Sequence, residues 1–145
     1  MGNDTKRAVL AATFERHAEE EGKILEQYRA LSEQLGSSSA GMLVNQILTE
    51  EEIHHLLLRT MAAWLKERRP AQARAIPRDA NRAELLRLTQ ILQQHERETI
   101  DACRSLTTQL GGESEALLGT LLDAMVLDSE KHHRLLGVVR QMLTA

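Results

Sequence analysis

Aromatic residues, proline and cysteine are all scarce in this sequence. Aromatic residues make up 2% of the chain, and its 145 residues include only two prolines and one cysteine, Cys103. A single cysteine excludes an internal disulfide framework and a metal site built from several thiolates. Leu, Ala, Glu, Gln and Arg are abundant instead, and these residues are strong helix formers. The composition therefore predicts an all-α protein.

Long apolar runs and an excess of positive charge are missing as well. No stretch approaches the roughly 20 apolar residues of a membrane-spanning helix. The first residues contain no apolar signal core, and Lys6 stands where an acylation motif requires Ser or Thr. A net charge of −3 does not provide the basic surface that nucleic-acid binding requires. We therefore expect a cytoplasmic protein that binds neither nucleic acids nor membranes.

Apolar residues recur at alternating steps of three and four along four segments, which is typical of helices that pack one face inward. These segments span residues 10–35, 44–65, 85–110 and 118–143. A hydrophobic fraction of 42% in 145 residues suits one domain that buries roughly two-thirds of its unfolded surface. We predict a four-helix bundle that occupies residues 1–145 as a single domain.

The second half of the chain repeats the first. Residues 21–36 align with residues 96–111, and the Glu-Ile-His-His at 52–55 aligns with the Glu-Lys-His-His at 130–133. We therefore predict two helical hairpins that are copies of one unit. The connection at residues 68–80 is polar, contains both prolines and exceeds the roughly 2–8 residues usual between antiparallel neighbours. This length favours a crossover along the bundle, and an antiparallel link stays open as the alternative.

Polar residues interrupt each apolar pattern near its middle. They are two single glutamates and two Glu-x-x-His pairs: Glu21, Glu96, Glu52 with His55, and Glu130 with His133. At a rise of about 1.5 Å per residue, all six lie at similar heights in a bundle. Four carboxylates inside a bundle are costly unless cations neutralise them, and two divalent ions would balance their charge. Oxygen and imidazole ligands suit iron or manganese, and di-iron carboxylate bundles use this ligand set.

The register of the first Glu-x-x-His pair needs a choice, because Glu51 and His54 have the same spacing. Ser129 stands opposite Glu51 in the second hairpin, so that register has no partner there. Glu52 and His55 also continue the apolar pattern of their helix. We therefore predict Glu52 and His55 as ligands.

With these residues in place, the chain resembles the ferritin-like superfamily over residues 8–143, most of all its bacterioferritin and rubrerythrin type of di-iron domain. The resemblance implies that the six residues hold two iron ions, with manganese or zinc as alternatives. It also implies oxidation of Fe(II), or reduction of oxygen or peroxide with an external electron donor that the sequence does not identify. Tyr28 lies two turns after Glu21, like the tyrosine near the di-iron site of ferritins. This position implies an electron or hydrogen-bond donor, and an ordinary core tyrosine is the alternative.

Several departures from the family narrow these expectations. Thr99 stands where rubrerythrins carry an additional glutamate, which argues against their peroxidase mechanism, and the four-cysteine rubredoxin domain is absent. Ile53 stands where bacterioferritins carry the methionine that ligates haem, so we expect no haem. The chain ends soon after His133, without the short helix of ferritin cages. We therefore expect a homodimer or small homo-oligomer rather than a cage.

Four further histidines lie near the predicted ligands. His17 precedes Glu21 by one turn and is a candidate additional ligand, whereas His54, His95 and His132 adjoin ligands and are expected to support them or to face solvent. Three functions remain open: a di-iron oxidase or ferroxidase, a non-enzymatic bundle that binds or sequesters metal, and a helical interaction module whose polar residues are only structural.

Overall fold

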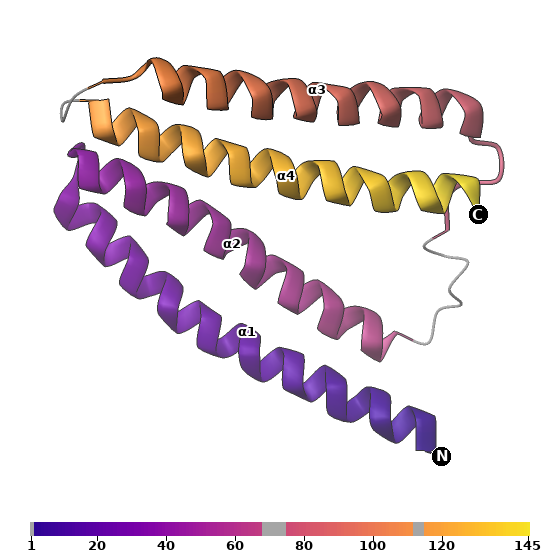
Figure 1. Ribbon diagram of the computed structural model, residues 1–145. Coiled ribbons are helices and arrows are strands. Elements are labelled where there is room, and N and C mark those ends of the chain that lie inside the picture. The colour runs from indigo at the N-terminus through magenta and orange to yellow at the C-terminus, as the bar shows by residue number, and fades with distance from the viewer. Residues whose placement is uncertain (1, 68–74, 112–114) are drawn as a thin grey trace. The chain divides into compact units, whose positions relative to one another are not determined.

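The computed structural model describes residues 2–67, 75–111 and 115–145, which form four α-helices (Figure 1). The helices are α1 (Gly2–Leu35), α2 (Ser39–Lys66), α3 (Arg82–Gln109) and α4 (Ala116–Thr144). No strand occurs in these described ranges, so the all-α prediction is confirmed. Wherever the chain is described, its helices lack the combination of length and apolar character that a membrane crossing demands.

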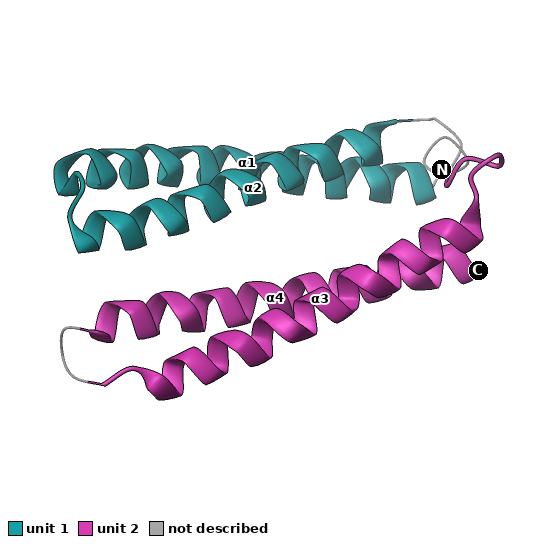
Figure 2. Ribbon diagram, turned by 90° about the horizontal axis from the view of Figure 1, so that it is seen from above, with its two compact units in different colours: residues 1–73 teal, residues 74–145 magenta. Residues whose placement is uncertain are grey.

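The chain divides into two compact units, residues 1–73 and residues 74–145 (Figure 2). The first unit is a hairpin in which α1 packs along α2, and the second is a hairpin in which α3 packs along α4. The predicted crossover at residues 68–80 falls largely on residues 68–74, which lie outside the described part. Packing of the two hairpins as one domain stays a prediction.

A glycine and a serine build the turn of the first hairpin. The N–H of Gly36 donates to the carbonyl of Ser32 at 3.0 Å, and the φ of Gly36 is +55°, a value that favours glycine at a helix end. Two residues further on, the Ser38 hydroxyl caps α2 by accepting from the N–H of Gly41 at 3.1 Å. A Cβ at Gly41 would clash with the carbonyl oxygen of Gly36. The turn therefore depends on the absence of a side chain at Gly41.

Small residues form the contact between α1 and α2. Ala11, Ala18 and Ala62 keep only 1%, 5% and 3% of their surface exposed, so the two helices approach closely where they lie. Among the described residues, no large side chain is completely buried. Each hairpin instead leaves large apolar side chains exposed, including Ile24 of α1 and Leu106 of α3. These side chains are available for contact with another apolar surface.

An arginine ties the start of each hairpin to its end. The guanidinium of Arg7 donates to the carbonyl oxygens of Trp64 and Leu65, at 3.3 Å each. The same arrangement recurs in the second hairpin, where Arg82 donates to the carbonyl of Leu143 at 3.1 Å. Both arginines thus donate to carbonyls in the last turn of the neighbouring helix, which lack N–H donors within their own helix.

We expect Gly41→Ala to destabilise the protein by about 1–3 kcal/mol, because the added methyl group meets backbone that cannot move without opening the turn. Gly119→Ala is the matched control, since nothing lies within 4 Å of a Cβ at that helical position. The control should be neutral or stabilising by up to about 1 kcal/mol. Urea unfolding of both full-length variants measures the difference. Equal stabilities would show that the turn relaxes freely.

Candidate metal centre

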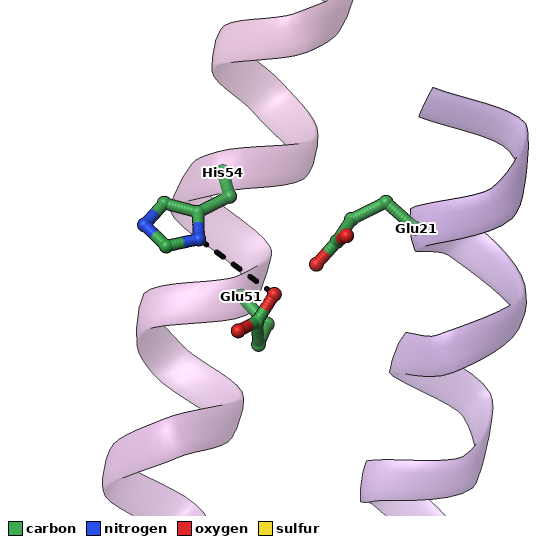
Figure 3. Close-up of side chains that lie close together, drawn as sticks. All are labelled: Glu21, Glu51 and His54. Carbon is green, nitrogen blue, oxygen red and sulfur yellow. Dashed lines mark ion pairs between the residues drawn. The ribbon is translucent and has the colours of Figure 1, made fainter. Parts of the chain in front are cut away.

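Three side chains with metal-ligating atoms meet where α1 packs against α2 (Figure 3). Glu21, Glu51 and His54 each offer one ligand atom, and these atoms all lie within 4.8 Å of one another. Glu51 and His54 share a face of α2 because they are three residues apart, and a carboxylate oxygen of Glu51 lies 3.6 Å from Nδ1 of His54. Glu21 reaches toward them from α1.

Burial makes Glu21 the central residue of this group. Its side chain is half-buried, and its Oε1 atom is inaccessible to solvent and has no hydrogen-bond partner in the described part of the chain. Buried polar atoms in native proteins are nearly always partnered by protein, water or an ion. A cation is therefore a fitting partner for Oε1, because carboxylate oxygens are ligands that divalent metals prefer.

The surroundings of Glu21 favour its protonated form when no cation is bound. A hydrogen bond with the Glu51 carboxyl is the main cause that raises the pKa of Glu21 above its ordinary value of 4.5. Burial and the charge of Glu51 raise this pKa further, and the nearby His54 lowers it. A cation at this place would require both carboxyl groups to be ionised, since ligating carboxylates are deprotonated.

The structure places the predicted ligands Glu52 and His55 away from this group. A carboxylate oxygen of Glu52 lies 3.4 Å from the guanidinium of Arg29, and the Glu52 side chain is 48% exposed. His55 lies beside Gly22, whose Cβ, if present, would be 3.5 Å from Cε1 of the imidazole, and both line a groove of about 530 Å³. Nδ1 of His55 is buried and, among the residues described, has no hydrogen-bond partner.

The second hairpin contains a related but smaller group. A carboxylate oxygen of Glu96 lies 3.5 Å from Nδ1 of His132, and the Glu96 side chain is only 16% exposed. Ser129, which is 6% exposed, stands one turn before His132, as Glu51 stands before His54. The pair of Glu96 and His132 thus corresponds to Glu21 and His54, and the second carboxylate is replaced by a hydroxyl.

Arginines engage the remaining predicted ligands, Glu130 and His133. A carboxylate oxygen of Glu130 lies 2.9 Å from the guanidinium of Arg104, which matches the contact of Glu52 with Arg29. Nε2 of His133 accepts a hydrogen bond from Nε of Arg97 at 3.1 Å.

Comparisons of the chain with protein-family models, with curated proteins and with solved structures found no match. A function for this protein is therefore inferred from its own residues.

Of the six predicted ligands, Glu21 and Glu96 lie close to histidines in the structure. These histidines are His54 and His132, which precede the predicted ligands His55 and His133 by one residue. Glu51 and His54 form a helical row of α2 one residue before the row of Glu52 and His55, and Leu58 and Leu65 fit both rows. The apolar pattern therefore did not distinguish them. The ligand set of an assembled site stays a prediction.

The other residues singled out by the sequence lie near these groups or at the surface. Tyr28 is half-buried on α1, two turns after Glu21. His17 lies 3.6 Å from the Glu20 carboxylate and is exposed, so its polar contact is with a surface residue. His95 is exposed on α3.

Glu21→Gln should flatten the pH dependence of stability in the metal-free protein. Because folding raises the pKa of Glu21, its contribution is fully present below pH 4.5, the ordinary pKa, and is lost as the pH rises through the raised pKa. Urea unfolding at pH values between about 2 and 8 measures this loss. Glu84→Gln is a control of opposite sign, since Arg87 lowers the pKa of Glu84 and that contribution is lost as the pH falls. A profile unchanged by Glu21→Gln would contradict the assignment.

Proposed function

We propose that this protein binds divalent metal ions through Glu21 and its neighbours and acts as a non-haem di-iron protein of the ferritin-like kind. The observation that supports the proposal best is the buried, unpartnered Oε1 of Glu21 beside Glu51 and His54. Glu21 and Glu51 are half-buried, whereas the His54 side chain is exposed. The proposed activity is oxidation of Fe(II), or reduction of oxygen or peroxide.

The donor set fits iron. Two carboxylates and one imidazole are ligands that first-row divalent metals accept, and they are typical of non-haem iron sites. Bound iron supplies one-electron chemistry with oxygen, which the side chains alone lack. Glu21, Glu51 and His54 would hold the ion, and the two carboxylates would balance its charge. Manganese and zinc suit the same ligands and remain alternatives.

We further propose that the two hairpins pack as one four-helix bundle that holds two ions. The exposed apolar faces support this proposal, because each hairpin alone buries mostly small residues. The second ion would bind near Glu96, which pairs with a histidine as Glu21 does. In such a bundle the ligands would follow either the row of Glu51 and His54 or the row of Glu52 and His55. Variants of the two neighbouring glutamates separate these rows.

Glu51→Gln should reduce the affinity for Mn(II) or Fe(II) by about tenfold or more, because it removes a charged ligand beside Glu21. Glu52→Gln is the matched control, with the same change one residue further along α2. Equilibrium dialysis followed by elemental analysis measures binding. Thermal melts with metal provide a second readout, since an ion at a thousandfold excess over its dissociation constant stabilises the folded state by about 4 kcal/mol.

The opposite result, loss of binding in Glu52→Gln alone, would assign the row of Glu52 and His55 instead. Unchanged metal content and unchanged melts in both variants would refute metal binding at this place.

Tyr28→Phe should slow oxidation of the Fe(II)-loaded protein without changing its iron content. The phenol can provide an electron or a hydrogen bond, whereas the phenyl ring keeps the packing and provides neither. Stopped-flow oxidation in air after anaerobic loading compares the two proteins at equal iron content. Identical traces would make Tyr28 an ordinary core residue. No oxygen uptake in either protein would favour metal sequestration over enzymatic function.

A further inference from the structure

The two hairpins differ at one position that matters for metal binding. In the first hairpin, Glu51 and His54 flank Glu21, so three side chains offer ligand atoms within 4.8 Å of one another. In the second hairpin, Glu96 and His132 are 3.5 Å apart, and Ser129 occupies the position that corresponds to Glu51. A neutral serine hydroxyl is a much weaker ligand for a divalent ion than a carboxylate.

We propose that the hairpins bind divalent ions unequally, with a tight site on the first hairpin and a weak, incompletely ligated site on the second. This inference rests on the proposed metal binding and adds an order of occupancy to it. Two anionic oxygens and an imidazole hold the first ion. One carboxylate and one imidazole hold the second, which therefore keeps more coordination positions for a small oxygen-donor ligand from solution.

The surroundings of the second pair agree with such a role. Glu96 and His132 line an open groove of about 320 Å³ with four apolar side chains, Leu92, Leu135, Leu136 and Val139. None of these four can ligate a metal, so the described groove supplies no third protein ligand from its lining.

Charge supports the same order of binding. The first group brings two carboxyl groups together, and their repulsion is relieved when a cation binds. The second group has one carboxylate next to a histidine, so a cation there neutralises less negative charge. The first ion thus gains more electrostatic stabilisation than the second.

Titration with Co(II) alone, followed by its visible absorption, tests the inference on the full chain. Wild-type protein should bind in two steps whose dissociation constants differ by about tenfold or more. Glu51→Ser, which copies the second hairpin into the first, should remove the tight step and leave weak binding. Two equal steps in wild type, or a tight step that survives in Glu51→Ser, would overturn the inference while leaving the proposed metal binding in place.

The reverse substitution provides a gain of function. Ser129→Glu should tighten the second step by about tenfold or more, because it completes the three-ligand group. A glutamine side chain has nearly the same size as glutamate but no charge, so Ser129→Gln should leave the second step weak. This variant controls for crowding at the buried position. Equal effects of both variants would contradict a ligand role for this position. No Co(II) binding by wild type at any step would refute the proposed function and this inference together.

Discussion

Two carboxyl groups share a partly buried place between α1 and α2, and this contact constrains the rest of the first hairpin. Ala18 and Ala62 are buried in the same hairpin, where the ligand atoms of Glu21 and Glu51 lie within 4.8 Å of each other. The contact raises the pKa of Glu21, so the two carboxyl groups are harder to ionise together. In the proposed metal-bound protein, a divalent cation would compensate both charges and partner Oε1 of Glu21.

The sequence predicted the four helices well, because their apolar residues recur at regular steps over long stretches. It also predicted Glu21 and Glu96 as the polar residues of these inward faces. It did not determine the register of α2, since Glu51 and Glu52 are adjacent and apolar residues such as Leu57 and Leu58 flank both rows. The rotation of a helix about its axis is set by its closest contact with a neighbour, here at Ala62, and this is a property of the pair of helices.

Equivalent polar contacts occur in both hairpins. Arg29 reaches Glu52, and Arg104 reaches Glu130, each joining the two helices of its hairpin. Exposed ion pairs of this kind contribute little to stability, typically about 0–1 kcal/mol. These ion pairs instead favour one axial position of each helix along its neighbour. The sequence repeat alone did not reveal them, because the arginines and glutamates are far apart in the chain.

The hairpin arrangement has a consequence for the order of events after synthesis. In each unit, the two helices that pack together are consecutive in the chain, so their contacts join neighbouring segments of the sequence. Proteins dominated by such local contacts fold within microseconds to milliseconds. Each hairpin can therefore form without waiting for a ligand. If the protein binds metal as proposed, the ion would meet side chains that are already arranged, and delivery of the metal would then set the time at which the protein matures.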